Sequence, residues 1–224
     1  MLSFGSAQDR GKLSVVATPI GNLEDITLRA LRVLKEADYV ACEDTRETRK
    51  LLSHFEIKTP AVNLKQLEKL LERGKQVALV SDAGTPGVSD PGLELVSNAR
   101  DAGHTIEAVP GASSLIAALS VAGLRAPTFT FYGFLPPKKG REKLFTAIAQ
   151  DQRSSVFYES PHRIMKTLAA LAALLPANRR VGVYRELTKL YEEHRVGSAQ
   201  DVLTHYAQNE DKQRGEFVIV VESR

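Results

Sequence analysis

The sequence predicts an α/β fold built from two lobes. Short β-rich runs alternate with amphipathic helical segments along most of the chain. The 224 residues are enough for one large domain or two small ones. The alternation is regular in the first half and looser in the second. We therefore place a boundary near residues 123–127, which gives an N-terminal lobe of residues 1–124 and a C-terminal lobe of residues 125–224.

The first half predicts a mostly parallel sheet. Its β-rich runs place strands at residues 13–17, 39–43, 77–81 and 105–109. Helices are expected at residues 25–36, 44–55, 65–73, 90–103 and 113–122. Asp44 and Glu47 have the spacing of a capping box, and Asp90 followed by Pro91 is typical of a helix start.

The second half repeats the pattern less regularly. Strands are expected at residues 128–134, 155–158, 181–186 and 216–222, with a further candidate at 192–196. Helices are expected at residues 141–150, 162–175 and 199–208. With the boundary near residues 123–127, this half is expected to form a second α/β lobe.

Composition excludes several classes of protein. The formal net charge of +3 permits an acidic partner without requiring one. The single cysteine, Cys42, excludes an internal disulfide and fits a small core residue. The five histidines are scattered, which argues against a zinc site. No apolar run approaches the ~18 residues of a membrane span, and no secretory signal is apparent, so we expect a soluble cytoplasmic protein.

Three loops after predicted strands have the composition of a ligand site. Ligands of open α/β sheets bind beyond the carboxyl ends of the strands. Residues 18–22 combine a proline with a glycine, and residues 81–92 contain three glycines, two prolines and two aspartates. Residues 110–114 open a helix with two serines. The first loop alone fits an ordinary turn, and Ser113 alone fits a helix cap.

The composition of residues 81–92 favours a polar, cationic ligand that carries an amino acid. The loop offers backbone N–H groups, hydroxyls and a carboxylate in one place. It lacks the Gly-Lys-Ser/Thr of a Walker A loop and the G-x-G-x-x-G of a dinucleotide site. Residues 110–114 also lack the second glycine of a nucleophile elbow, since Leu115 stands there, which disfavours a serine hydrolase.

Charged residues gather at other strand ends. On the helix after Asp44, the cations Arg46, Arg49 and Lys50 fall on one side and the apolar residues on the other. This pattern fits a solvated face or a phosphate-binding surface. The segments FYESPHR at residues 157–163 and YRELTK at 184–189 also place charges at strand ends, where single ion pairs would explain some of them.

These motifs, in this order, resemble the tetrapyrrole methylase superfamily. The matching stretches are VVATPIGNLEDITLRAL, EDTRETRKLLSHF, VALVSDAGTPGVSDPG, VPGASSLIAAL, FYGFLP, FYESPHR, RELTK and GEFVIVVE. The EDTR and SDAGTP blocks resemble a bacterial branch that methylates the ribose 2′-oxygen of a cytidine in the decoding region of 16S rRNA. The resemblance implies two α/β lobes with S-adenosylmethionine in the cleft between them, and a homodimer.

The resemblance also implies roles for individual residues, and no metal. The implied cofactor-binding residues are Thr18, Pro19, Gly21, Asn22, Ser81, Asp82, Ala83, Gly84, Thr85, Pro86, Pro110, Gly111, Ser113, Ser114, Tyr158, Glu159 and Leu187. The candidates for contacts with 16S rRNA in the small ribosomal subunit are Arg46, Arg49, Lys50, His162, Arg163 and Arg185. The candidates for polarising the ribose oxygen are Glu43, Asp44, Glu159, Glu186 and Lys189, and the residue patterns do not choose among them.

The chain departs from the family pattern at two loops. Leu64 runs directly into Lys65, where relatives carry a longer loop, and residues 137–141 are slightly short.

Two alternative functions stay open. One is carbon methylation of a corrin precursor, which the fold permits. The other is a non-catalytic RNA-binding module. The basic EDTRETRK helix favours a polyanionic partner over the corrin precursor.

Overall fold

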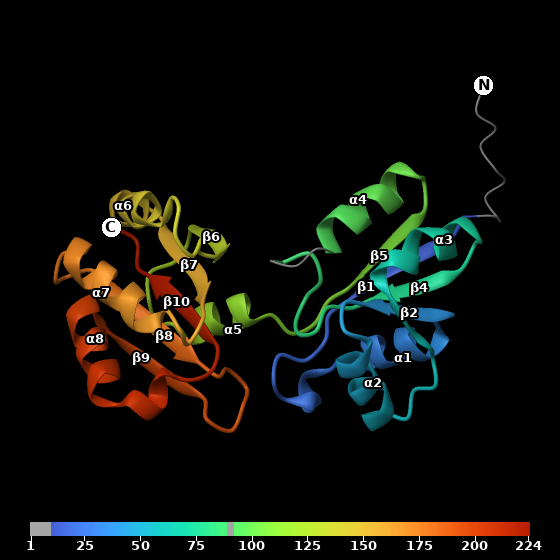
Figure 1. Ribbon diagram of the computed structural model, residues 1–224, viewed down its shortest axis with the longest axis horizontal. Helices are drawn as coiled ribbons and strands as arrows, with labels where there is room; N and C mark the ends of the chain where they lie inside the picture. The colour runs from blue at the N-terminus through green and yellow to red at the C-terminus, as the bar shows by residue number, and fades with distance from the viewer. Residues whose placement is uncertain (1–9, 89–91) are drawn as a thin grey trace. The chain divides into compact units, whose positions relative to one another are not determined.

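The computed structural model describes residues 10–88 and 92–224 and contains two compact units. The units are Met1–Ser113 and Ser114–Arg224, and each contains one five-stranded sheet with helices packed against it (Figure 1). The expected helix start at Asp90 and Pro91 lies outside the described residues. In the described part of the chain, no helix has the length and apolar character needed to cross a membrane.

The sheet of the first unit is parallel, in the order β3-β2-β4-β1-β5. Its strands are β1 (Lys12–Val16), β2 (Tyr39–Cys42), β3 (Ala61–Asn63), β4 (Gln76–Leu79) and β5 (Thr105–Val109). Because every neighbouring pair is parallel, all five carboxyl ends lie along the same edge of the sheet.

The helices of the first unit cover both faces of this sheet. Its α-helices are α1 (Leu28–Glu36), α2 (Thr45–His54), α3 (Leu67–Glu72) and α4 (Gly92–Asp101), and the 3-10 helices are η2 (Leu23–Asp25) and η3 (Leu64–Gln66). Residues of α1 and α2 share one buried cluster with Val16, Ala78 and Val109. Residues of α3 and α4 share another with Leu13 and Leu79 on the opposite face (Figure 1).

The sheet of the second unit is mixed, in the order β6-β7-β10-β8-β9. Its strands are β6 (Phe129–Phe134), β7 (Ser154–Glu159), β8 (Arg180–Arg185), β9 (Glu193–Ser198) and β10 (Phe217–Val221). Strands β6 and β7 are parallel, whereas β10 and β9 are antiparallel to their neighbours. The looser alternation of the second half therefore corresponds to a sheet with three antiparallel pairings.

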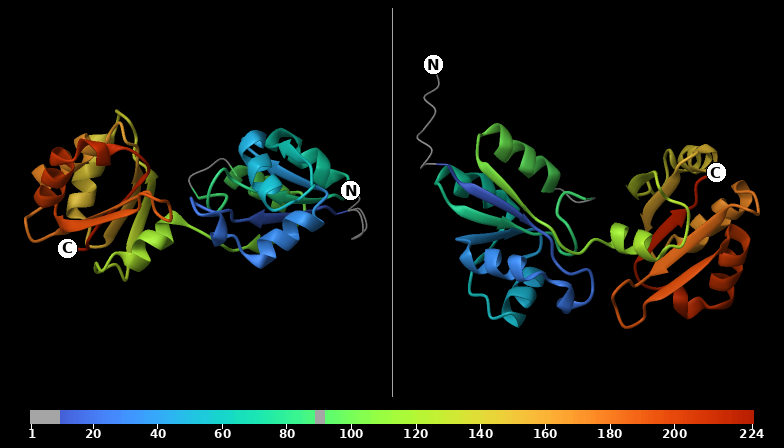
Figure 2. Two further views of the ribbon diagram at one scale, coloured as in Figure 1. Left: turned by 90° about the horizontal axis from the view of Figure 1, so that it is seen from below. Right: turned by 180° about the vertical axis from the view of Figure 1, so that it is seen from behind.

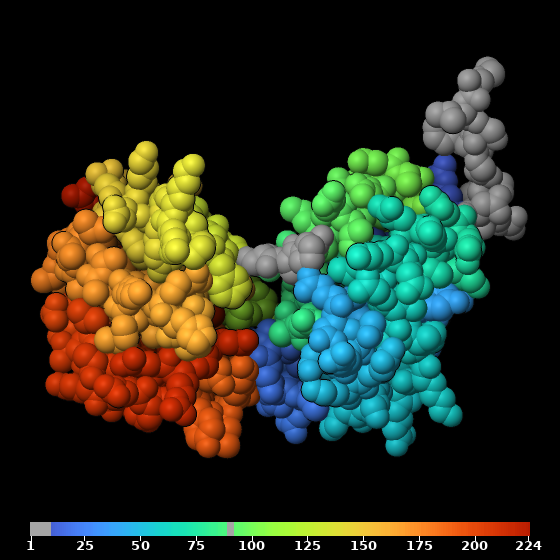
Figure 3. Space-filling view, viewed as in Figure 1, coloured from blue at the N-terminus to red at the C-terminus, as the bar shows by residue number. Residues whose placement is uncertain are grey.

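Three helices cover one face of the second sheet, and a fourth covers the other. Helices α6 (Arg141–Gln150), α7 (Ile164–Leu174) and α8 (Ala199–Gln208) share one apolar core with β7, β8 and β10. Figures 1 and 2 show these three helices on one side of the sheet and α5 (Ser114–Val121) on the other. In Figure 3 helices α6, α7 and α8 appear as successive yellow, orange and red bands on the surface of the second unit.

Helix α5 belongs to the second unit, although the sequence places it before the expected boundary at residue 124. The hydroxyl of buried Tyr184 donates a hydrogen bond to the carbonyl of Ala122, at 3.2 Å. Ser114 Oγ at the helix start donates to Tyr158 Oη, at 2.9 Å. These hydrogen bonds to β8 and β7 explain why the boundary between the two compact units falls between Ser113 and Ser114.

The expected strands and helices are confirmed, most of them within two residues. Strand β3 was not among the strands expected from pattern alone. Helix α1 starts at Leu28 rather than residue 25, because the Thr27 hydroxyl accepts from Ala30 N and caps it there. Asp44 is confirmed as the helix cap, but the capping box is wrong: Asp44 accepts from Arg46 N rather than from Glu47 N, and Glu47 pairs with Lys50. At the short Leu64–Lys65 loop, β3 leads directly into η3.

A buried carboxylate ties β7 to the starts of α6 and α7. The Glu159 side chain has no exposed surface. Its Oε2 accepts from Arg141, at 2.5 Å, and from Thr167, at 2.6 Å. Its Oε1 accepts from Arg163 Nε and from Ser160 N, both at 2.8 Å. Burial by itself raises the pKa of this carboxyl, but these hydrogen bonds outweigh the burial and the pKa is lowered.

We expect Glu159→Gln to lower the free energy of unfolding of the second unit by about 3 kcal/mol at pH 7, because two partly buried arginines lose their counter-charge. The pKa of Glu159 is lowered in the fold, so the carboxylate stabilises the protein above its unfolded pKa of about 4.3. That contribution is lost as the pH falls through the lower folded pKa. Denaturant titrations of both proteins at pH 7 and at several lower pH values test this.

The matched control is Glu142→Gln, which removes an exposed carboxylate from the same region. Its free energy of unfolding should stay within about 0.5 kcal/mol of the original protein. A difference between Glu159→Gln and the original protein that does not shrink in acid would contradict the assignment.

Candidate functional site

The carboxyl ends of β1 and β4 form a switch point of the first unit's sheet, and we refer to this position as the crevice because open α/β sheets bind ligands there. These strands are neighbours in the sheet. Helix α1, which follows β1, packs on one face, whereas α4, which follows β4, packs on the other. The two connections therefore diverge from adjacent strands. Such a switch point is where ligands bind in open α/β sheets.

Backbone hydrogen bonds join the loops on the two sides of this crevice. Thr18 N donates to Gly84 O, at 2.9 Å, and Gly84 N donates to Thr18 O, at 3.1 Å. This isolated antiparallel bridge links the segment after β1 to the segment after β4. The buried Thr18 hydroxyl lies 3.3 Å from Ser81 O and 3.4 Å from Gly84 O and donates to them. The two predicted cofactor loops thus form one structure.

Gly84 is required by this arrangement. Its φ of +78° lies in the left-handed region, which residues other than glycine rarely adopt. A Cβ at this position would lie 3.3 Å from Ile20 Cγ2 of the facing loop. The glycine therefore allows both the turn and the close approach of the two loops.

The third predicted loop packs against the first two. Thr85 Oγ1 donates to Ala112 O, at 3.1 Å, and Ala17 N donates to Val109 O, at 3.1 Å. A Cβ on Gly111 would lie 3.0 Å from Ala17 Cβ. All three loops therefore meet at the carboxyl ends of β4, β1 and β5, which are consecutive strands in the sheet.

The loop hydroxyls donate to loop backbone. Ser81 Oγ donates to Ala83 O, at 3.1 Å, and to Gly84 O, at 3.3 Å. Asn22 Oδ1 accepts from Glu24 N and caps η2. Pro19 and Pro86 are buried, whereas Gly21, Asp82, Ala83, Pro110 and Gly111 are exposed. The hydroxyls of Thr18, Ser81 and Thr85 hold the loops in shape, and Asp82 and the exposed backbone offer polar groups at the crevice.

The charges of the loops favour a cationic ligand. Residues 17–22, 80–88 and 109–114 contain no lysine or arginine and include the carboxylate of Asp82. A phosphate-bearing ligand is usually held by cationic side chains, which these loops lack. A sulfonium or ammonium group is matched by a carboxylate and by backbone carbonyls. The residues present therefore fit S-adenosylmethionine better than a nucleotide di- or triphosphate.

Helix α2 starts beside this crevice and exposes the predicted cations. Asp44 N donates to Asp82 Oδ1, at 3.3 Å, which fixes the start of α2 to the 81–86 loop. Arg46 and Arg49 are exposed, and neither has an ion pair within residues 10–88 and 92–224. Lys50 is exposed and pairs with Glu47, at 2.7 Å.

The predicted residues of the second unit fall into separate local groups. Tyr158 is half-buried and accepts from Ser114, and burial raises the pKa of its hydroxyl. Glu159 and Arg163 belong to the buried carboxylate cluster described above. His162 is exposed, and Leu187 is buried.

Glu186 and Lys189 form an ion pair in a strained loop. Lys189 Nζ lies 3.0 Å from Glu186 Oε1 and 2.9 Å from Glu216 Oε2. Burial lowers the pKa of Lys189, but its hydrogen bonds to the two carboxylates outweigh this and raise the pKa. Glu186 and Thr188 have φ values of +51° and +65°, which are strained for these residue types. Strain of this kind is concentrated at functional sites.

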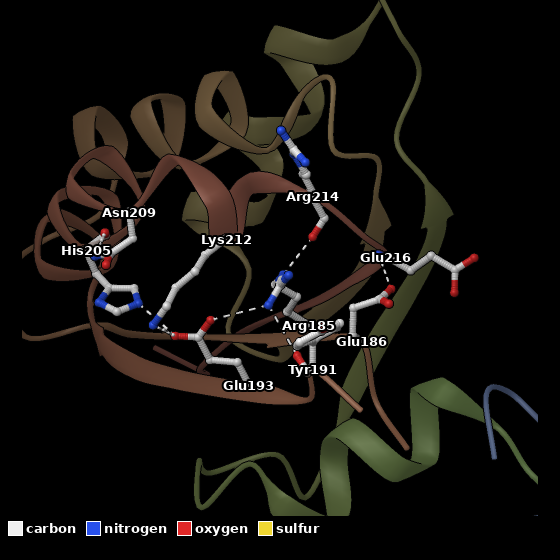
Figure 4. A network of polar contacts seen from close by, with 9 residues as sticks. All are labelled: Arg185, Glu186, Tyr191, Glu193, His205, Asn209, Lys212, Arg214 and Glu216. Carbon is white, nitrogen blue, oxygen red and sulfur yellow. Dashed lines mark hydrogen bonds and ion pairs between the residues drawn. The ribbon is translucent and has the colours of Figure 1, made fainter. Parts of the chain in front are cut away.

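Arg185 lies in an internal polar network rather than on a free surface (Figure 4). Its guanidinium donates to Arg214 O, at 2.6 Å, and to Tyr191 O, at 3.2 Å. It also lies 3.8 Å from Glu193, whose other oxygen contacts His205 and Lys212, each at 2.8 Å. Arg185 therefore fixes the loop after β8, and the prediction that it contacts RNA finds no support in this geometry.

Sequence patterns missed the partners of several predicted residues. Arg141, Thr167 and Glu216 were not among the expected site residues, although they hold Glu159 and Lys189. Gly215 has a φ of +98°, and a Cβ there would meet the Glu186 side chain at 2.6 Å. The glycine before Glu216 in the sequence was the available signal for this close approach.

The chain resembles methyltransferases in sequence and in structure. Residues 12–203 match the family Tetrapyrrole (Corrin/Porphyrin) Methylases. The chain is 45% identical to the ribosomal RNA small subunit methyltransferase I of Halalkalibacterium halodurans, over 98% of this chain and 78% of that relative. It is 40% identical to the Thermotoga maritima protein of the same name, over 96% of this chain and 99% of that relative.

A solved structure, uroporphyrin-III-C-methyltransferase from Thermus thermophilus, superposes with a TM-score of 0.67 at 24% identity. The superposition covers 95% of this chain and 94% of that chain, and at this identity it shows the fold alone. The family match and the curated relatives extend over most of the sequence. The chain therefore belongs to the tetrapyrrole methylases and, within that family, to the ribosomal RNA small subunit methyltransferase I group.

Proposed function

We propose that this protein transfers a methyl group from S-adenosylmethionine to the ribose 2′-oxygen of a cytidine in the decoding region of 16S rRNA. The observation that carries the proposal is the 40–45% identity to proteins named for small-subunit rRNA methylation. The exposed Arg46 and Arg49, on a helix that starts at the candidate cofactor crevice, support a polyanionic substrate.

The joined loops of the first unit are proposed to hold the cofactor. When bound, S-adenosylmethionine supplies a methyl group on a sulfonium, which needs no metal for activation. Asp82 and the loop backbone offer carboxylate and amide groups to its charged and polar parts. The Thr18–Gly84 bridge keeps these groups in place before binding, which lowers the ordering cost of binding.

The geometry supports different roles for the five candidates for polarising the ribose oxygen. Asp44 caps α2, and Glu159 is enclosed by its four donors, so we assign both to structure. Lys189 has a raised pKa and stays charged at neutral pH, so it can donate a hydrogen bond but cannot act as a base. We assign orientation of the ribose to the Glu186–Lys189 pair. Glu43 is exposed and remains a candidate for accepting the proton.

A corrin precursor and a non-catalytic role are the competing functions. Tetrapyrrole methylases of known structure support the first by fold alone. The identity to rRNA methyltransferases over nearly the whole chain favours RNA as the substrate. A non-catalytic module would not require three loops packed around a crevice whose charges suit a sulfonium.

Methyl transfer tests the function directly. Tritiated S-adenosylmethionine is incubated with the protein and small ribosomal subunits that lack the modification. We expect label in 16S rRNA, at a ribose 2′-oxygen, because the family and the crevice both indicate this chemistry. Label in a corrin precursor but not in subunits would support the competing enzyme. Absence of label, together with intact RNA binding, would support the non-catalytic module.

Gly84→Ala should weaken binding of S-adenosylmethionine at least tenfold. The alanine would cost about 1 kcal/mol in backbone strain and would push against Ile20, which separates the two loops. The control is Gly103→Ala, because Gly103 has a φ of +79° but its Cβ would meet only Arg10 Cζ, at 3.9 Å. Calorimetric titration should show normal affinity for the control. Equal weakening in both variants would mean that strain, and not the crevice, sets the affinity.

Arg46→Glu combined with Arg49→Glu should weaken binding of rRNA about tenfold or more, because both side chains are exposed and available to phosphates. Cofactor affinity should stay unchanged, because neither residue belongs to the three loops. The control combines Arg73→Glu with Arg100→Glu, an identical change of charge near the amino ends of β4 and β5. Filter binding at fixed salt compares them. Equal loss of RNA and cofactor binding would refute this division of roles.

A further inference from the structure

The carboxyl ends of β6 and β7 carry a cluster of positive charge. The two strands are parallel neighbours, so the loops that follow them leave the same edge of the sheet. Residues 135–140 follow β6, and residues 160–163 follow β7. The cations of this cluster are Lys138, Lys139, Arg141 and Arg163.

The only buried carboxylate of this cluster in the described part of the chain is already neutralised. Both oxygens of Glu159 are occupied, by Arg141 and Thr167 on one side and by Arg163 and Ser160 N on the other. One carboxylate faces two guanidinium groups. The centre of the cluster therefore keeps an excess positive charge before the two lysines are added.

Arg141 holds the loop after β6 in place. Its Nη1 donates to Pro136 O, at 3.1 Å, and its backbone N–H donates to Lys138 O, at 3.3 Å. Lys138 and Lys139 are both exposed. Throughout residues 10–88 and 92–224, no carboxylate forms an ion pair with either lysine. The loop thus presents two adjacent ammonium groups from a backbone that is fixed by the buried cluster.

Arg163 is positioned to bind an anion. Its Nε donates to Glu159, at 2.8 Å, and its side chain is 25% exposed. Its terminal nitrogens have no hydrogen bond to the described residues. A guanidinium that is held through Nε while its terminal nitrogens stay open is well suited to phosphate oxygens.

An exposed aromatic ring lies at the same edge of the sheet as these cations, on the opposite face from Glu159. A register shift between Phe131 and Phe134 interrupts the pairing of β6 with β7, and Gly133 within it has a φ of +61°. The rings of Phe131 and Phe134 lie 5.1 and 5.3 Å from the ring of Tyr158. The irregularity thus brings residues three apart onto the same side of the strand, and Phe134 remains 57% exposed.

We propose that Phe134, Lys138, Lys139 and Arg163 form a binding surface for single-stranded RNA. Phe134 stacks on a base, and the three cations hold the flanking phosphates. Exposed aromatic rings among cations are the usual means of holding unpaired nucleotides. An acidic protein would use the cations but would leave the ring without a partner. The proposal rests on the proposed rRNA substrate and adds to it a contact surface on the second unit.

Lys138→Gln combined with Lys139→Gln tests the phosphate contacts. The probe is an RNA oligonucleotide with the decoding-region sequence, whose binding to this protein is measured over a range of salt concentrations. We expect about tenfold weaker binding and a salt dependence whose slope falls by about 1.4, the value for two lost contacts to a single strand. The control, Lys35→Gln with Lys58→Gln, removes two exposed lysines near the amino ends of β2 and β3 and should change neither quantity.

Substitution of Phe134 separates stacking from charge. Phe134→Leu should weaken binding about tenfold without changing the salt slope, and Phe134→Trp should restore the affinity. Thermal melts and cofactor titrations of each variant establish that the fold and the crevice are intact. Loss of affinity in both Phe134 variants alike would overturn the stacking role.

The same measurements distinguish failure of this surface from failure of the proposed function. If the original protein methylates subunits and binds the oligonucleotide, but the lysine variant binds as tightly as its control, the surface is refuted and an acidic protein becomes the better partner. If the original protein neither methylates nor binds RNA, the proposed function fails first. A lysine variant that loses cofactor affinity but keeps RNA affinity would also overturn the proposal.

Discussion

The reciprocal backbone hydrogen bonds between Thr18 and Gly84 set the shape of the first unit's candidate site. They join the loops that leave β1 and β4 in opposite directions, at the switch point of the sheet. Without such a bond, each loop would be an independent connection with its own range of conformations. The bridge needs a residue at position 84 that adopts a φ of +78° and leaves room for Ile20, which restricts that position to glycine.

The order of strands and helices could be predicted from sequence because the apolar periodicity is strong in both halves. Short elements with little pattern were harder to locate. Strand β3 has only three residues, Ala61–Asn63, and none of them is buried. A segment this short has no apolar run by which it could be recognised in the sequence. The start of α1 was misplaced because residue 25 belongs to a separate 3-10 helix, η2, that precedes the α-helix. Asn22 caps η2, and only Thr27 caps the α-helix.

The location of the candidate cofactor loops was also predictable, but the roles of their side chains were not. Composition indicated hydroxyls for a ligand, whereas Thr18, Ser81 and Thr85 donate to carbonyls of the loops themselves. The side-chain partners of charged residues were not predictable for a related reason. Arg185 resembles a surface cation in sequence, yet its acceptors are the carbonyls of Tyr191 and Arg214. Such partners depend on long-range packing, which periodicity and motif spacing do not encode.

The distribution of charge in the first unit suits the proposed combination of a sulfonium cofactor and a polynucleotide substrate, which carry opposite charges. A cation within the three loops would repel the cofactor by about 4 kcal/mol at 4 Å, for an effective dielectric constant near 20. It would also attract phosphates into the crevice. The loops avoid both effects because they contain no lysine or arginine. Arg46 and Arg49 instead project from α2 into solvent, where charges are screened over about 8 Å at physiological salt.

The residues that join the start of α2 to the 81–86 loop are anionic. Asp44 N donates a hydrogen bond to Asp82 of the loop, and the Asp44 carboxylate caps α2, so two carboxylates lie where the helix meets the loop. Their negative charge offsets the field of Arg46 at the crevice. The exposed sides of the arginines remain available to phosphates. One helix start can therefore border a site for a cation and begin a surface for a polyanion, because the residues that cap the helix carry the opposite charge to those that follow.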